Sequence, residues 1–151
     1  MAFNFRFQSI LDLRCRQRDE AGAAVGQANQ AIARIDEQTE QVEAQRLELR
    51  TQNNPNRIGH VSVEGLLSVG RYEMQLQADL AQLAATRAEL VRELDRRQLA
   101  LIEAEAEVKR FEKLSSNERV SHQTKMNVRE QADADERSTQ AYILARRVPN
   151  S

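Results

Sequence analysis

Residues 76–94 read LQADLAQLAATRAELVREL, and leucines recur in this stretch at spacings of three, four and seven residues. They fall on one side of a helix, because an α-helix repeats every 3.6 residues. The pattern extends in both directions as two rows with a period of seven. The rows are Val69, Leu76, Leu83, Leu90, Arg97, Ala104 and Phe111, and Leu66, Glu73, Leu80, Arg87, Leu94, Leu101 and Val108. This sustained repeat predicts a long helix with the apolar seam of a coiled coil.

A thinner seam, rich in alanine, precedes this one. Its rows are Phe7, Arg14, Ala21, Ala28, Ile35, Val42 and Leu49, and Leu11, Arg18, Val25, Ile32, Thr39 and Arg46. Between the two seams, Asn53, Asn54 and Pro55 suit a helix end and a break. Ser62 can cap the next helix, and Glu64 favours its positive N-terminal end. We therefore expect a helix at about 4–52, a loop at 53–61 and a second helix at about 62–146.

The predicted fold class is all-α: a long antiparallel two-helix coiled-coil hairpin, forming a single domain over residues 1–151, with an overhanging C-terminal helix. With the loop at the tip, the numbers of facing residues sum to about 115. This register pairs Leu49 with Leu66, Ala28 with Arg87, and Arg18 with Arg97. Two arginines facing each other should weaken the seam at that point. After Phe111 the repeat dissolves, so this part of the helix should extend alone and fray unless a partner holds it.

The composition excludes several classes of protein. Only 4% of the 151 residues are aromatic, which argues against a globular core. A net charge of −1 provides no field that would draw the chain onto nucleic acid or an anionic membrane. No apolar run approaches the roughly 18 residues of a membrane helix, so direct membrane insertion is not expected. The single Cys15 and the absence of a secretory signal favour a reducing, cytoplasmic setting.

No pattern in the sequence predicts catalysis or a cofactor. His60 and His122 lie far apart with no further ligand at metal-binding spacing, and the carboxylates fall on the polar helix faces. The glycines are isolated, so no phosphate-binding loop is present. We therefore expect a protein that is not an enzyme and that uses neither a metal nor another cofactor.

Three features near the N-terminus have competing interpretations. Arg14, Arg16 and Arg18 form a basic cluster without interleaved aromatics, which suits an acidic protein surface better than nucleic acid. These arginines could also lower the pKa of Cys15, although an inert surface thiol is the favoured interpretation. Gly22 and Gly26 mark a close helix approach, a soft point in the helix, or neither.

The sequence resembles the FliJ family of flagellar type III export proteins along nearly its whole length. Residues 3–14 (FNFRFQSILDLR) are similar to the family's aromatic start and its leucine pattern, followed by residues 19–21 (DEA). Residues 109–114 (KRFEKL) and 129–136 (REQADADE) are similar to two later family segments. The order and spacing of these motifs carry the resemblance.

The resemblance implies a non-catalytic component of the flagellar export ATPase complex that looks like the central stalk of rotary ATPases. In the family, the end with both termini inserts into the hexameric ring of the export ATPase FliI and promotes its assembly and activity. The hairpin tip contacts the cytoplasmic domain of the export gate protein FlhA, and some members handle free export chaperones. Membrane association would then be peripheral, through these partners.

Residue matching to the family gives two sets of expected contacts. The ring contacts are Leu11, Leu13, Arg14, Arg18, Glu130, Gln131, Asp135 and Glu136. The gate contacts are Gln38, Val42, Leu49, Tyr72 and Leu76; relatives carry aromatics around position 45, where this chain has Gln45. A generic coiled-coil adaptor or self-associating structural protein is the alternative function. The loop and the matching seams argue against an extended form of that alternative.

Overall fold

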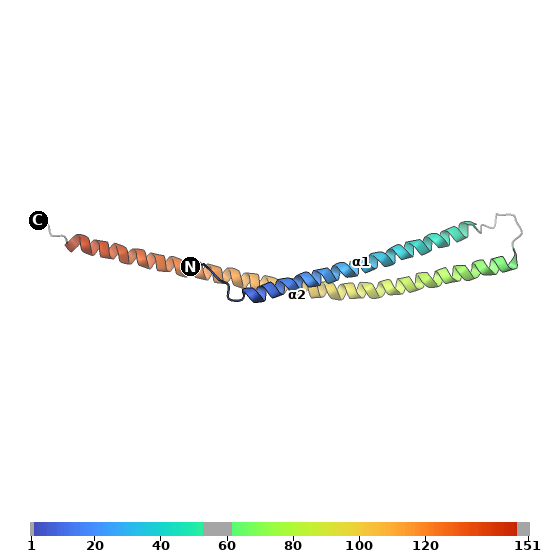
Figure 1. Ribbon diagram of the computed structural model, residues 1–151, viewed down its shortest axis with the longest axis horizontal. Coiled ribbons are helices and arrows are strands. Elements are labelled where there is room, and N and C mark those ends of the chain that lie inside the picture. The colour runs from blue at the N-terminus through green and yellow to red at the C-terminus, as the bar shows by residue number, and fades with distance from the viewer. Residues whose placement is uncertain (1, 53–61, 148–151) are drawn as a thin grey trace. The chain divides into compact units, whose positions relative to one another are not determined.

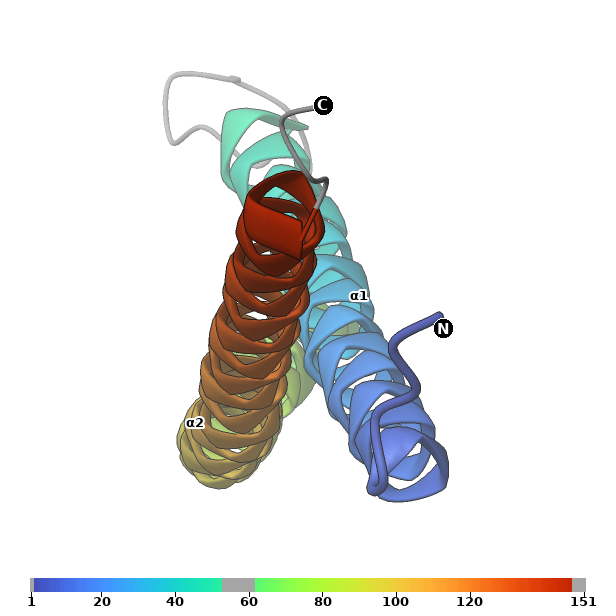
Figure 2. The same cartoon turned by 90° about the vertical axis from the view of Figure 1, so that its left-hand side faces the viewer.

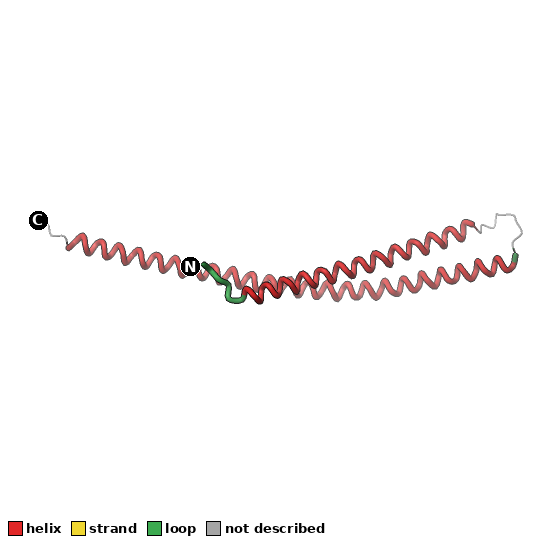
Figure 3. Tube along the Cα trace, viewed as in Figure 1, coloured by secondary structure: helices red, strands yellow, loops and turns green. Residues whose placement is uncertain are grey.

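The computed structural model describes residues 2–52 and 62–147, which are helical apart from short segments at residues 2–7 and Ser62 (Figures 1 and 3). Helix α1 covers Gln8–Gln52 and helix α2 covers Val63–Arg147. The described residues contain no strand. The predicted all-α helical hairpin is therefore confirmed, while the expected loop at 53–61 lies outside the described residues.

The starts of the two helices follow from local hydrogen bonding. The Ser62 side chain accepts a hydrogen bond from the backbone amide of Gly65 at 3.0 Å, so Ser62 caps α2 as predicted. Helix α1 begins at Gln8, later than the expected position near residue 4. The amide of Gln8 donates to the carbonyl of Phe5 at 3.2 Å, and the amide of Leu11 donates to Phe7 at 2.9 Å. A turn at residues 5–8 therefore precedes the first helical bond.

The chain divides into two compact units, and each helix contributes to both. The hairpin unit is Gln17–Ala104. The terminal unit combines Met1–Arg16 with Glu105–Ser151. In the hairpin unit, α1 and the green-to-yellow part of α2 run antiparallel and side by side (Figure 1).

Both predicted seams face the interior of the hairpin unit. Ala28 of α1 and Leu76 of α2 are its most buried residues, each 3% exposed. Nearly all the other seam positions in this unit are half-buried; Leu66 and Arg87 are exposed. The period of seven therefore identified which side of each helix is covered.

The predicted register was wrong by one heptad. The interhelical contacts pair Arg46 and Arg50 with Glu73, Asp36 with Arg87, and Ala24 with Arg97. The numbers of these partners sum to between 119 and 123, which is four to eight more than the expected 115 and fits a shift of one heptad. After a slip of seven residues, seam positions still lie opposite seam positions, so the heptad period alone leaves this choice open.

The corrected register removes the expected clash between Arg18 and Arg97. Arg97 Nη1 donates to the carbonyl of Ala24 at 2.8 Å, and its Nε donates to Glu93 at 3.0 Å. Arg18 pairs with its neighbour Asp19 at 3.2 Å. Each arginine thus satisfies its charge without facing the other.

In the terminal unit, residues 2–7 extend the packing on α2 beyond the start of α1. Phe5 is buried, as is Val108 of α2. The ring of Phe3 lies 5.6 Å from that of His122, and the guanidinium of Arg119 lies 5.5 Å from the Phe3 ring. Figure 2 shows this segment as the dark blue coil entering α1. The expectation that α2 is uncovered after Phe111 was therefore wrong, because the aromatic N-terminus contacts it as far as His122.

The remainder of α2 in the terminal unit has no described segment packed against it. From residue 123 to residue 147 every side chain is exposed except Met126, which is half-buried. Four large apolar side chains, those of Val128, Tyr142, Ile143 and Leu144, are exposed here. The overhanging helix predicted from the sequence thus begins after His122.

Candidate partner-binding surfaces

A groove lined with amides lies between α1 and α2 in the hairpin unit and has a volume of about 460 Å³. Its floor is apolar, and its rims carry mostly glutamines. The lining residues are Ile35, Gln38, Gln41, Val42, Gln45, Asp79, Gln82, Leu83 and Thr86. Two of the expected gate contacts, Gln38 and Val42, lie in this groove. Such a surface offers hydrogen-bond donors and acceptors around a small apolar floor.

The other three expected gate contacts differ in their accessibility. Leu49 lines a smaller hollow with Arg50, Val69 and Glu73. Tyr72 is exposed on α2. Leu76 is almost fully buried in the seam, so it has nearly no surface to offer a partner. Its position is that of a residue that holds the two helices together.

A charge cluster lies beside this smaller hollow. Arg46 Nε donates to Glu73 Oε1 at 2.7 Å, and Arg50 approaches the same oxygen at 3.5 Å. The hydrogen bond from Arg46 is the main cause that lowers the pKa of Glu73 below its ordinary value of 4.5, and the charges of Arg46 and Arg50 act in the same direction against partial desolvation. Glu73 is therefore ionised at neutral pH, and the cluster fixes the helices in register.

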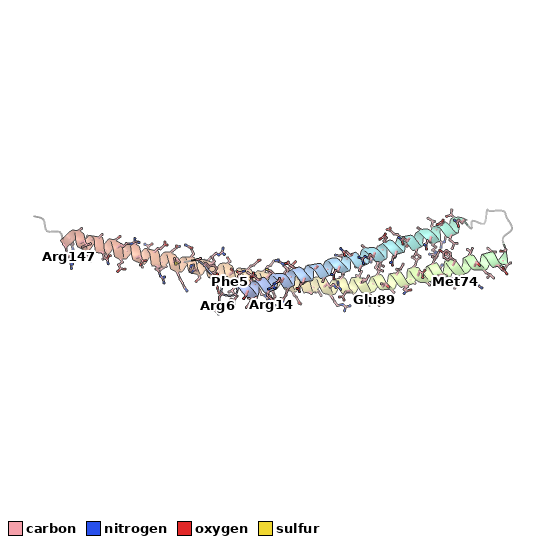
Figure 4. The ribbon with its side chains drawn as sticks, viewed as in Figure 1. Phe5, Arg6, Arg14, Met74, Glu89 and Arg147 are labelled. Carbon is pink, nitrogen blue, oxygen red and sulfur yellow. The ribbon has the colours of Figure 1, made fainter. Side chains whose placement is uncertain are left out.

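The expected ring contacts near the N-terminus occupy two environments. Leu11, Arg14 and Arg18 are half-buried at seam positions of α1, whereas Leu13 is exposed. Figure 4 labels Phe5, Arg6 and Arg14, which all belong to the terminal unit. Arg6 lies over the ring of Phe7 at 4.8 Å. The basic cluster predicted from the sequence is thus partly used in packing.

The expected ring contacts on α2 are all exposed but do not share one face. Gln131 and Asp135 line a shallow hollow with Thr124, Asn127, Val128 and Ala132. Glu130 and Glu136 are exposed outside that hollow. Because each residue advances a helix by about 1.5 Å, Gln131 lies about 14 Å beyond His122, where contact with the N-terminal segment ends. The terminal unit therefore does not gather Leu11, Arg14 and Gln131 into one patch.

Sequence reasoning missed several residues of these surfaces. Phe3, Arg119 and His122 form a cluster that the fading heptad concealed, although the alternating aromatics at residues 3–7 signalled a packed segment. In the groove, Asp79 and Thr86 occupy the position just before the seam in successive heptads of α2. Polar residues repeating at a flanking position would have predicted this lining.

The remaining sequence candidates show no ligand site in the part of the chain that is described. No group of three or more His, Cys, Asp or Glu residues could hold a metal ion within residues 2–52 and 62–147. Within those same residues, no helix has the length and apolarity to cross a membrane. Cys15 is a half-buried free thiol. A Cβ atom at Gly26 would meet open space, so close helix approach does not explain that glycine.

Comparison with known protein families shows to which family the chain belongs. The model of the family described as Flagellar FliJ protein matches residues 3–147. The chain belongs to the FliJ family. No curated protein and no solved structure matches the chain. The resemblance seen in the sequence is thereby confirmed.

Membership of the FliJ family makes the chain a component of flagellar protein export. The family is a non-catalytic component of flagellar export. Both helices fall within the match, because it begins in the aromatic N-terminal segment and ends at the last residue of α2. The two kinds of surface described above therefore both lie within the matched region.

Proposed function

We propose that the chain acts as a central-stalk-like protein of the flagellar type III export apparatus, working as a single hairpin over residues 1–151. It docks in the ring of the export ATPase FliI, promotes ring assembly and activity, and links the ring to the cytoplasmic domain of FlhA. The protein is cytoplasmic and reaches the membrane peripherally through these partners. Free export chaperones are further partners. The observation that carries the proposal is the family match over residues 3–147.

The exposed end of α2 supports docking in a ring. An isolated helix is marginal in water, because most helical stability in proteins comes from packing of an apolar face. Residues 123–147 expose Val128, Tyr142 and Leu144 with no described segment beside them. A surrounding partner would cover these side chains and stabilise the helix. The proposed ring contacts are Leu11, Leu13, Arg14, Arg18, Glu130, Gln131, Asp135 and Glu136.

The groove of the hairpin unit supports a second contact, with the gate. Its glutamines can bond a partner's backbone or side chains around the apolar floor of Ile35 and Val42. The proposed gate contacts are Gln38, Val42, Leu49 and Tyr72, with Leu76 holding the helices beneath them. Two surfaces of different chemistry allow one chain to contact two different bodies.

The test is the ATPase rate and hexamer population of the partner ATPase with and without this protein. The informative variant is Gln131→Arg/Asp135→Arg, which changes the hollow on α2. A matched control is Gln30→Arg/Glu37→Arg, with the same total charge change at two exposed positions of α1 that are not proposed ring contacts. We expect the protein to raise both quantities, and the first variant to weaken this effect about tenfold while the control keeps it.

Two results would count against the proposal. If the folded protein changes neither the rate nor the hexamer population, a generic coiled-coil adaptor becomes the better interpretation. If both variants change the ATPase rate and the hexamer population to the same extent, docking does not use the Gln131 side of α2. The residue assignment then fails, while the proposed stalk role stands.

A further inference from the structure

A second apolar row runs along α2 in the hairpin unit, beside the seam that packs on α1. We call it the side row. It also has a period of seven, and its members are Val63, Leu67, Gly70, Met74, Gln77, Ala81, Ala84, Ala88, Val91, Asp95, Gln98 and Ile102. All of them are exposed except Val91, which is half-buried. A helix whose only partner were α1 would carry polar residues here.

The large side chains of the side row are strongly exposed. Val63 is 72% exposed, Met74 71% and Ile102 60%. Met74 is labelled on α2 in Figure 4. Exposed apolar residues that recur along one side of a helix mark an interaction site more often than scattered single residues do. A second heptad row on one helix indicates that the partner is itself a helix.

We propose that the side row pairs with the side row of a second copy of this chain, with the two α2 helices antiparallel about a two-fold axis between Ala81 and Ala84. In this register the residue numbers of facing positions sum to 165. Val63 then faces Ile102, Met74 faces Val91, and Ala81 faces Ala84 of the other copy. Alanines thus meet at the axis, where helices approach closely. On each side, the apolar pairs Met74–Val91 and Val63–Ile102 are separated by pairs that contain a polar residue, Gln77–Ala88, Gly70–Asp95 and Leu67–Gln98. The row is self-complementary, as a two-fold interface requires.

Charge supports the same register. Asp95 is the only charged residue in the side row, and it faces Gly70 of the second copy, with Arg71 next in the chain. Neither Asp95 nor Arg71 forms an ion pair with another described residue of its own chain. The two-fold axis creates this Asp95–Arg71 pairing twice. A foreign partner would have to supply its own basic residue at that position.

The length of the row is sufficient for a dimer. From Val63 to Ile102 the helix extends about 60 Å, and a helix is about 10 Å wide. The footprint is therefore roughly 600 Å² per copy, or about 1,200 Å² in total, above the about 1,000 Å² expected of a specific interface. This inference does not depend on the proposed export function.

Sedimentation velocity over a range of protein concentrations tests the proposal. We expect the wild type to form a dimer as concentration rises. Ala84→Arg places two like charges at the axis and should leave only monomer, with helicity by circular dichroism unchanged because Arg is a good helix former. The control Ala100→Arg lies about 160° around the same helix and should dimerise like the wild type. A wild type that stays monomeric, or an Ala84→Arg dimer as strong as the wild type, overturns the proposal.

Disulfide trapping tests the register without relying on the arginine variant. In a Cys15→Ser background, Met74→Cys/Val91→Cys should crosslink into a covalent dimer, because these positions face each other. Met74→Cys/Gln98→Cys lies one heptad, or about 10 Å, out of register and should not crosslink, since a disulfide needs Cα atoms within about 7 Å. Equal crosslinking of both pairs, or of neither, overturns the register and the two-fold pairing with it.

Discussion

Two stretches of the same helix α2 have different surroundings. Residues 76–104 pack along α1 in the hairpin unit, where Leu76 is almost fully buried. Residues 123–147, in the terminal unit, are exposed apart from half-buried Met126. Both stretches are rich in strong helix formers such as Ala, Glu, Gln and Arg. The difference shows that composition makes α2 helical along its length, whereas packing on α1 covers one part and leaves the other part exposed.

The largest expected effect concerns burial in the paired stretch. Leu76→Ala removes a buried side chain at the centre of the seam and should lower the free energy of unfolding by about 2–4 kcal/mol. Leu99→Ala, the same exchange at a side chain of α2 that is 62% exposed, should change it by less than about 0.5 kcal/mol. Urea unfolding followed by circular dichroism measures both. Equal effects would mean that the seam is not what stabilises this stretch.

Hydrogen exchange compares the two stretches directly. Backbone amides of residues 123–147 should exchange about 100-fold faster than those of residues 76–94, since the former open locally and the latter only with the hairpin. Adding the export ATPase should slow exchange over residues 115–146, because the ring would hold this helix. Exchange that is equally fast with and without the ATPase would rule out ordering of this part by the ring.

A smaller effect is expected for the hydrogen bond that joins the two helices of the hairpin unit. Arg97→Ala removes the hydrogen bond to the carbonyl of Ala24 and should lower the free energy of unfolding by about 1–2 kcal/mol. Arg96→Ala removes only an exposed pairing with the same Glu93 and should cost less than about 0.5 kcal/mol. Matching urea midpoints for the two variants would show that the interhelical bond adds nothing.

The smallest expected effect is on the acid response of the paired stretch. The pKa of Glu73 is lowered in the folded state, so its ionised form contributes stability that is complete above the ordinary value of 4.5 and is lost as pH falls through the lower folded value. Glu73→Gln should therefore lose less stability than the wild type between neutral pH and a pH below 4.5. Thermal melts at a series of pH values measure this. Parallel curves for the two proteins would show that Glu73 does not contribute to the acid response.

The sequence proposed residues for the candidate partner surfaces, but it did not predict which of them are accessible. Matching to the family proposed Gln38, Val42 and Leu76 as neighbours near one end of the hairpin. The first two line a groove, whereas Leu76 does not line it and is almost fully buried in the seam. Sequence matching assigns a residue to a region, but the direction of its side chain depends on which side of the helix the neighbouring helix covers.

The sequence by itself determined that the chain is two long helices and which side of each is apolar, because a period of seven and the Ser62 cap are local properties. Only the tertiary structure decided the register. Sliding one helix by seven residues still places seam positions opposite seam positions, so the choice depends on which individual side chains meet. Arg46 with Glu73, Asp36 with Arg87, and Arg97 with Ala24 are such pairs. Likewise, the contact of Phe3 with His122 arises from folding, because the two residues are far apart in the chain.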